Sequence, residues 1–448
     1  LQKLKDYTVV LVGILLIVLV CNQIFGNALA LRGGLKSHQQ TSSETSTTQQ
    51  THQTQLEVGG SQTAQIRTIV WSGALETFKH YPLFGSGLET FGYSYYLFRP
   101  AAHNYTTEWD FLYNKAHNEF LNYLSTTGAV GFLTYLLFIG AFEYFAIRTL
   151  VKMKWGAPRF LGLGILSGFN TALGANFFGF SVVPTNLLFF TFPVFFFLTT
   201  DSLGEKLYKI SFEKNLSFLK NNLNNNIAKV LVAIISFSLF LSVVGYWIGD
   251  FLYSKSFGAT DYQKSVRYLR TAVKLAPYEP VYRIELASNL ASLAGAINEE
   301  DKNSEEVKTA AKEAQAIIDD LAKEHPNDTS LWQNKKGIDY DLAKIDPKNN
   351  DELLITAETL KRLAPTDASI QYDVALVYLY LDKNQHAQQQ LEKVVALKND
   401  YRDAVLALAR TEIKNKNNDA ASKLLQDWIK KNPADSEAED LLKSLLTS

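Results

Sequence analysis

Residues 129–149 read AVGFLTYLLFIGAFEYFAIRT, an apolar stretch with a single acidic residue, Glu143. A helix needs about 20 consecutive, mostly apolar residues to cross the hydrocarbon core of a bilayer, so this stretch is expected to span a membrane. Four further stretches have the same character, at residues 8–29, 160–180, 182–200 and 227–249. The sequence therefore predicts an all-α chain that contains a polytopic bundle of about five transmembrane helices.

Basic residues predict the orientation of these spans, because short loops rich in Lys and Arg stay on the cytoplasmic side. They gather before the first span, between the second and third, and between the fourth and fifth: Lys3, Lys5, Arg148, Lys152, Lys154, Arg159, Lys206, Lys209, Lys214 and Lys220. These three places alternate along the chain, so all of them can be cytoplasmic at once. Residues 31–127 and 251–448 are then both expected to be extracytoplasmic.

These patterns divide the chain into four segments. Residues 1–30 hold the first span, residues 31–127 form a large outer loop, residues 128–250 hold spans two to five, and residues 251–448 are polar. Residues 31–60 are rich in Ser, Thr and Gln and poor in apolar side chains, which predicts a disordered tract. The chain begins at Leu1 and its only methionine is Met153, so we expect that an upstream part is missing.

Composition excludes several classes of function. The formal net charge is −1, which gives no global basic field for a nucleic acid. Cys21 is the only cysteine, so a disulfide framework and a cysteine zinc site are excluded. The sequence contains no phosphate-binding glycine loop, HExxH motif or GxSxG motif. No metal site and no cofactor are predicted.

The polar segment 251–448 contains an internal repeat. Pro365, Asn399 and Pro433 lie 34 residues apart in similar turns, and Pro277 and Pro326 mark related turns with longer spacing. Small and large residues recur between these turns: Ala375, Tyr378, Ala387, Leu391, Ala409, Ala421 and Leu425. This pattern resembles a tetratricopeptide array, which stacks helix pairs into an α-solenoid that binds partners. A generic helical bundle is the alternative.

The outer loop holds the residues best suited to chemistry. Residues 61–80 read as an amphipathic helix, with apolar residues at helical spacing: Ile66, Val70, Trp71, Ala74, Leu75 and Phe78. Arg67 lies four residues before Trp71, and Lys115, His117 and Asn118 lie just before the next span. A cationic residue there could hold a phosphate, and a histidine could accept a proton near neutral pH.

Two runs of the loop resemble the O-antigen ligase and polymerase superfamily. The first, RTIVWSGALETFKHYPLFGSGLETF at residues 67–91, has an arginine four residues before a tryptophan and then a Pro-Leu-x-Gly-x-Gly turn. The second, AHNEFLNYLSTTGAVGFL at residues 116–133, has an Ala-His-Asn element before a Gly-x-x-Gly helix start. A tetratricopeptide tail also occurs in that superfamily.

The resemblance implies glycosyl transfer at the outer face of the bacterial inner membrane. The donor would be a glycan on a polyprenyl pyrophosphate, and the acceptor a hydroxyl of a glycan, a lipid or a protein, with no nucleotide or metal ion required. His117 would be the general base and Arg67 the pyrophosphate ligand. The substrate-binding candidates are Lys115, Asn118, Arg99, His103 and Trp71. Family members also use arginines that would precede Leu1, so this chain is expected to hold only part of the site.

Other functions are compatible with parts of the sequence. A non-catalytic membrane scaffold could use the repeats to recruit protein partners for envelope assembly, and a transporter could move lipid-linked sugars. The ordered loop motifs favour the enzyme over a scaffold, and the placement of polar residues outside the spans disfavours a transporter. Nothing in the sequence separates a ligase from a polysaccharide polymerase.

Overall fold

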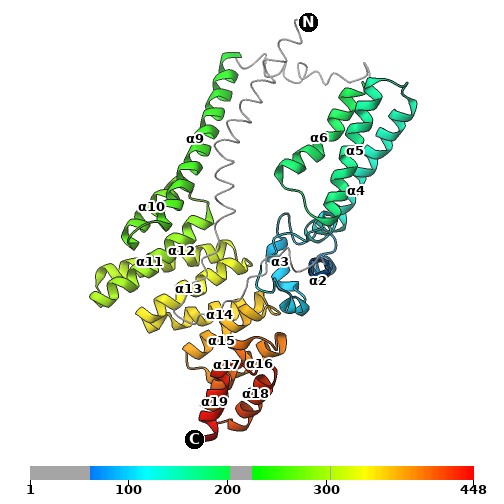
Figure 1. Ribbon diagram of the computed structural model, residues 1–448. Coiled ribbons are helices and arrows are strands. Elements are labelled where there is room, and N and C mark those ends of the chain that lie inside the picture. The colour runs from blue at the N-terminus through cyan, green and yellow to red at the C-terminus, as the bar shows by residue number, and fades with distance from the viewer. Residues whose placement is uncertain (1–60, 112, 202–224, 303, 448) are drawn as a thin grey trace. The chain divides into compact units, whose positions relative to one another are not determined.

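The computed structural model describes residues 61–111, 113–201, 225–302 and 304–447. Every regular element in these ranges is a helix, which confirms the predicted all-α class (Figure 1). The predicted first span and the predicted disordered tract lie outside the described residues.

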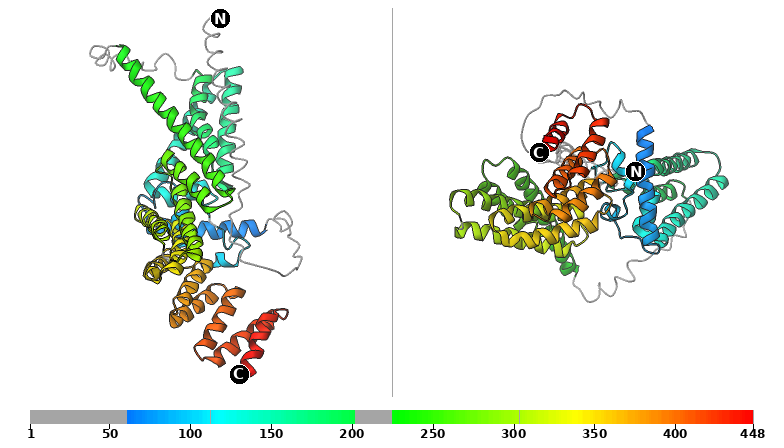
Figure 2. Two further views of the ribbon diagram at one scale, coloured as in Figure 1. Left: turned by 90° about the vertical axis from the view of Figure 1, so that its left-hand side faces the viewer. Right: turned by 90° about the horizontal axis from the view of Figure 1, so that it is seen from below.

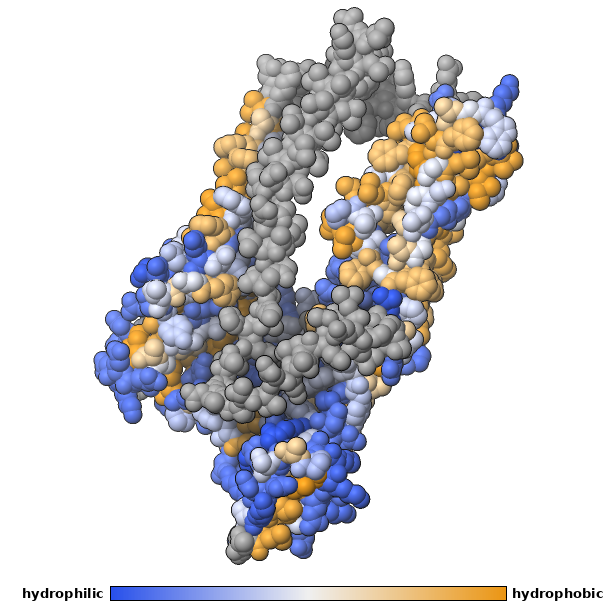
Figure 3. All heavy atoms as spheres, in the orientation of Figure 1, coloured by the Kyte–Doolittle hydropathy of each residue, from blue (hydrophilic) through white to orange (hydrophobic). Residues whose placement is uncertain are grey.

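Four apolar helices correspond to the predicted spans two to five: α4 (Glu119–Lys152), α5 (Ala157–Phe178), α6 (Val183–Thr199) and α9 (Asn225–Phe257). Within the described ranges, three helices are long and apolar enough to cross a membrane, namely α4, α5 and residues Val230–Phe257 of α9, whereas α6 is apolar but shorter. Hydrophobic side chains cover much of the visible surface of these helices, while hydrophilic residues dominate the repeats (Figure 3). Helices that face lipid carry apolar side chains on their outside, so this contrast agrees with membrane-spanning helices.

An aromatic core joins α4, α5 and α6. The Phe142 ring lies 4.7 Å from that of Phe169, which stacks at 4.6 Å on Phe189. Glu143, the acid within α4, accepts a hydrogen bond of 2.9 Å from the side-chain amide of Asn170 on α5. A polar group in an apolar medium is costly without such a partner.

The described part of the outer loop is helical. It contains α2 (Ser61–His80), α3 (Phe91–Phe98) and the 3₁₀ helix η1 (Ala101–Tyr105). Ile66, Val70 and Ala74 form the buried stripe of α2 and pack with residues of α3, whereas Leu75 is 41% exposed. The predicted amphipathic helix is therefore present, but its buried face is narrower than the sequence pattern indicated.

The remaining helices form the repeat region: α10 (Tyr262–Leu275), α11 (Pro280–Glu300), α12 (Glu305–Glu324), α13 (Thr329–Ile345), η2 (Pro347–Asn349), α14 (Asn350–Leu363), α15 (Ala368–Tyr380), α16 (Asn384–Leu397), α17 (Arg402–Lys414), α18 (Asn418–Lys431) and α19 (Ser436–Thr447). The predicted turns at Pro277, Pro326, Pro365, Asn399 and Pro433 all fall between consecutive helices. Figures 1 and 2 show these helices following one another in chain order as a stack.

The small and large repeat positions pack as the pattern predicted. Ala375, Ala387, Leu391, Ala409, Ala421 and Leu425 are fully buried, and Tyr378 is nearly so. The two long spacings have separate causes. Between Pro277 and Pro326 the helices themselves are longer, at 21 and 20 residues, and before Pro365 the chain adds η2. The C-terminal region is a helical solenoid of the tetratricopeptide type.

Candidate active site

A backbone clasp fixes the start of the loop against α4. The turn after α2 donates through the amides of Ser86 and Gly87 to the carbonyls of Ser125 and Thr126, at 3.0 and 2.9 Å. In return, the amides of Ala129 and Val130 donate to the carbonyls of Pro82 and Leu83, at 2.8 and 3.1 Å. The helix deviates from α-helical geometry only at Gly128, where φ is +65°. The clasp places the end of α2 and the start of α4 side by side.

His117 lies at the junction between the loop and α4. Its backbone has φ +52°, a left-handed conformation that is uncommon for a residue with a side chain. Asn118 then caps the helix, because its side-chain oxygen accepts from the amide of Leu121 at 3.0 Å. The His117 ring is half-buried and contacts two other rings at their edges, those of Tyr113 at 5.2 Å and Phe180 at 5.1 Å.

The electrostatic surroundings of His117 favour its neutral form. Burial lowers the pKa of the imidazole, and the positive charge of Arg67 lowers it further, against a weaker opposite effect of Glu108. A histidine that is neutral at pH 7 has a free nitrogen lone pair and can accept a proton. The geometry therefore gives His117 the protonation state that a general base needs.

Arg67 is the nearby cation in this arrangement. Its positive charge lowers the pKa of both His117 and Tyr113. The Nε atom of Arg67 is buried and has no hydrogen-bond partner in the part of the chain that the structure describes, and the same holds for the indole nitrogen of Trp71 one turn later. Buried donors are rarely left unpaired, so these two groups are available to an anionic or hydroxylated ligand.

Lys115 and Asn118 are adjacent in sequence to His117 but are engaged differently. The ammonium group of Lys115 pairs with the carboxylate of Glu89, which itself is exposed. The Asn118 side chain is 3% exposed and serves as the helix cap. Lys115 can therefore still contact a ligand from the exposed side of its ion pair. Asn118 instead positions the segment that carries His117.

Arg99 and His103 are buried where the loop packs against the repeats. Arg99 is 3% exposed and makes an ion pair of 2.7 Å with Asp367, and it also donates to the carbonyl of Trp109. His103 is fully buried, with Nδ1 2.8 Å from the hydroxyl of Tyr95. Burial and the charge of Arg99 lower the pKa of His103 to about 4. Both side chains serve this packing in the structure and are left out of the proposed site.

Other residues next to His117 gave no signal in the sequence. Tyr113 lies between the rings of His103 and His117 and donates to the carboxylate of Glu108. Phe180, from the segment between α5 and α6, contributes a ring to His117 from a part of the chain far away in sequence. Only the three-dimensional packing brings these groups to His117. Among the described residues, no group of three His, Cys, Asp or Glu side chains is arranged as metal ligands.

Comparison with known proteins identifies two parts of the chain. A family model described as O-antigen ligase matches residues 2–136, a range that includes Arg67, Trp71 and His117. A tetratricopeptide-repeat model matches residues 378–445. A search of curated proteins found no match.

Solved structures similar to the chain include a thermophilic tetratricopeptide-repeat protein from Thermus thermophilus, with 18% identity over 46% of this chain and 100% of that one, at a TM-score of 0.29. A tetratricopeptide-repeat protein from Parabacteroides merdae has 19% identity over 44% and 72% of the two chains, with a TM-score of 0.33. MamA from Desulfovibrio magneticus has 17% identity over 43% and 97%, also at 0.33. The two family-model matches confirm the resemblance seen in the motifs: residues 2–136 are similar to O-antigen ligases, and residues 378–445 are similar to tetratricopeptide repeats.

Proposed function

We propose that this protein transfers a glycan from a polyprenyl pyrophosphate carrier to an acceptor hydroxyl. Two observations carry the proposal: the charge of Arg67 lowers the pKa of His117 in the same loop, and the buried Nε of Arg67 has no partner among the described residues. Both residues lie within the range that matches the O-antigen ligase family. The proposal covers both attachment of a finished chain and extension of a growing one.

The two side chains have complementary roles in the proposed reaction. The acceptor oxygen forms a bond to the anomeric carbon of the donor sugar while its proton passes to a ring nitrogen of His117. The bond from that carbon to the pyrophosphate oxygen breaks, and the electron pair leaves with the pyrophosphate. The guanidinium of Arg67 stabilises the developing negative charge, because it is permanently cationic and matches phosphate oxygens with two parallel donors.

Trp71 and Lys115 extend this site as proposed substrate contacts. The unpaired indole nitrogen of Trp71 can donate to a sugar or phosphate oxygen, and its ring lies 6.2 Å from that of Phe177. Lys115 adds a second positive charge on the entry side. Asn118 acts through the backbone, by holding the helix start that orients His117.

The proposed location is the inner membrane of a bacterium, with several passes and with residues 31–127 and 251–448 on the extracytoplasmic side. His117 directly precedes α4, whereas Arg148, Lys152, Lys154 and Arg159 lie at the other end of α4 or shortly beyond it. A cluster of positive charges at one end of a span is usually retained in the cytoplasm, and this supports the proposal that His117 lies at the outer face. A reporter enzyme fused after Ser448 should be active only outside the cytoplasm, and cytoplasmic activity would exclude this topology.

Complementation tests the proposed chemistry in cells. The full-length protein is expected to restore glycan transfer in a strain that lacks its own ligase, and the His117→Ala and Arg67→Ala variants are expected to fail. His80→Ala is the matched control, because His80 is an exposed residue of the same loop whose ring lies against those of Tyr81 and Phe98. Full transfer by both variants, at the same level in the membrane, would show that the catalytic assignment is wrong.

A further inference from the structure

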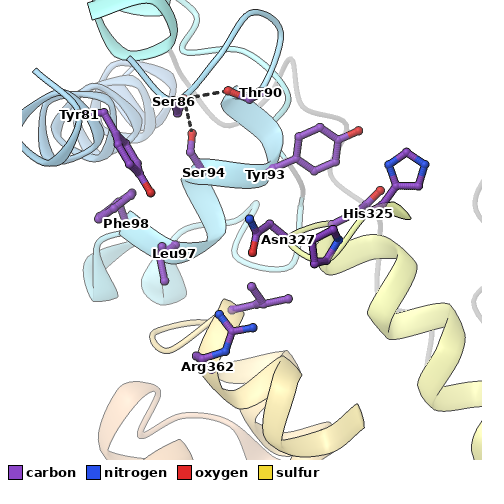
Figure 4. Close-up of a pocket in the computed structure, with 13 residues that line it drawn as sticks. Tyr81, Ser86, Thr90, Tyr93, Ser94, Leu97, Phe98, His325, Asn327 and Arg362 are labelled. Carbon is purple, nitrogen blue, oxygen red and sulfur yellow. Dashed lines mark hydrogen bonds between the residues drawn. The ribbon is translucent and has the colours of Figure 1, made fainter. Parts of the chain in front are cut away.

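A cavity lies between the outer loop and the repeats. It has a volume of about 410 Å³, which is within the range of roughly 300–1,000 Å³ that is typical of ligand sites. The loop contributes the aromatic residues Tyr81, Tyr93 and Phe98, and the repeats contribute Asn327 and Arg362 among others. Figure 4 shows the aromatic side chains on one side of this space and the polar groups of the repeats on the other.

The two walls differ in chemistry. Tyr81 and Tyr93 are 38% and 48% exposed, so part of each ring is open to a ligand. On the opposite wall, Asn327 and Arg362 are exposed, and neither side chain makes a hydrogen bond or an ion pair with the described part of the chain. The loop wall therefore offers ring surface beside the hydroxyl groups of Ser86, Thr90 and Ser94, and the repeat wall offers unused donors and acceptors beside Pro326 and Leu363.

A second cavity lies beside the first. It has a volume of about 320 Å³, shares Tyr93 and Asp328 with the first cavity and is also lined by Lys115. Lys115 is two residues before His117 in the sequence. We name these two neighbouring cavities the loop–repeat groove, whose lining residues include Arg362, Tyr93 and Lys115.

We infer that the loop–repeat groove binds a saccharide chain whose reacting end lies near His117, an inference that rests on the proposed function. Sugar rings combine apolar C–H faces with hydroxyl edges, which suits a groove with aromatic residues on one wall and polar side chains on the other. A peptide is a poorer match, since among the described helices the groove offers no strand edge for β-pairing and no continuous apolar face for a helix. The repeats thus contribute to substrate recognition.

A binding experiment on the full-length protein in lipid nanodiscs tests this inference. The probes are oligosaccharides released by mild acid from the surface polysaccharide of the cells that carry this gene, and tryptic peptides from the envelope of the same cells. Calorimetry should detect the oligosaccharides and not the peptides. Tyr93→Ala and Arg362→Ala should each weaken oligosaccharide binding by about tenfold or more.

Matched controls separate the groove from general effects on folding. Tyr278 is 87% exposed, and Arg267 is an exposed arginine without an ion pair in the described residues, and neither lines the groove. Tyr278→Ala and Arg267→Ala should bind the oligosaccharides like the unmodified protein. Equal binding by the groove variants and the unmodified protein, or binding of peptides alone, would overturn the inference.

The His117→Ala variant distinguishes failure of the inference from failure of the proposed function. It should keep oligosaccharide binding and lose transfer. If His117→Ala still transfers glycan while the groove variants lose binding, the assignment of His117 as the base is wrong and the saccharide groove is supported. A lipid-linked donor glycan and a released acceptor glycan share this chemistry. Displacement of the released oligosaccharides by a lipid-linked glycan would show that the groove holds the donor chain, and no displacement would show that it holds the acceptor chain.

Discussion

At the scale of the residue, two histidines of one loop differ in their burial and in their partners. His103 is fully buried and hydrogen-bonded to Tyr95, whereas His117 is half-buried and lies near Arg67. The sequence analysis named both as candidates, because residue type and position in the loop do not distinguish a structural histidine from a general base. Burial and partners separate them, and neither can be read from spacing alone.

The rate of transfer should depend on pH through His117. Burial and Arg67 lower the pKa of this residue below its ordinary value of 6.5, so the base is neutral at pH 7 and becomes protonated only at lower pH. The rate should be level above pH 6.5 and fall as the pH decreases through the lowered pKa. Replacing Arg67 with Gln removes the positive charge and should move the midpoint to higher pH, while Arg67→Lys should leave it nearly in place. Residual rates of both variants across pH check this, and an equal midpoint for both would contradict the electrostatic role of Arg67.

His103 should make stability depend on pH in a separate way. Its pKa is lowered to about 4 in the folded protein, against 6.5 when unfolded, so the unfolded state binds more protons between these two values. Stability should therefore be full above pH 6.5 and decline towards pH 4, by at most about 3 kcal/mol. His103→Gln should flatten this decline in melting temperatures measured in nanodiscs, whereas His80→Gln should not. An unchanged slope in His103→Gln would mean that another group carries the acid sensitivity.

At the scale of the element, glycines determine how the outer loop joins the membrane helix. Gly85 and Gly128 have φ values of +71° and +65°, and their backbones lie against each other in the clasp. A Cβ atom at Gly128 would come within 2.4 Å of the backbone carbonyl carbon of Leu83. The sequence analysis identified a Gly-x-x-Gly helix start at this place, and α4 is distorted at the first of these glycines, Gly128. The sequence could not predict that this kink packs against the Pro82–Gly87 turn, because the two segments are about 40 residues apart in the chain.

Gly128→Ala should therefore destabilise the clasp and lower activity. The left-handed conformation alone costs a residue with a Cβ atom about 1–2 kcal/mol, and the backbone clash adds to this cost. Gly140→Ala on the same helix is the matched control, because a Cβ atom there meets nothing within 4 Å. Hydrogen exchange of the amides of Ser86 and Ala129 measures the clasp directly. Equal protection in the two variants would show that the clasp does not depend on this glycine.

At the scale of the whole molecule, the loop and the repeats form one packed unit. Thr366 donates to the carbonyl of Arg99, Lys398 donates to the carbonyl of Asn104 at 2.9 Å, and Trp109 contacts Tyr401 with ring centres 5.1 Å apart. The sequence predicted the helical repeats, and their turns lie where the 34-residue spacing placed them. It predicted no contact between the repeats and the loop, because hydrogen bonds across more than 260 residues leave no periodic signal.

The buried ion pair between Arg99 and Asp367 should hold this contact together. Both side chains are less than 10% exposed, and removing one partner of a buried pair costs about 3–5 kcal/mol. Arg99→Ala should thus raise hydrogen exchange across residues 99–109 and 366–401 and reduce glycan transfer. The control is Arg270→Ala, whose pair with Glu313 is exposed and should contribute less than about 1 kcal/mol. Equal hydrogen exchange in Arg99→Ala and Arg270→Ala would show that the Arg99–Asp367 ion pair does not hold the loop against the repeats.

The most direct test of the central claim measures transfer by the purified full-length protein. A glycan on polyprenyl pyrophosphate serves as the donor, the envelope glycan of the host cells serves as the acceptor, and the unmodified protein is compared with His117→Ala and His80→Ala in the same nanodiscs. We predict transfer by the unmodified protein and by His80→Ala, and a loss of about 10²–10⁴-fold in His117→Ala. Transfer by His117→Ala at the rate of the unmodified protein would contradict the assignment of His117 as the general base.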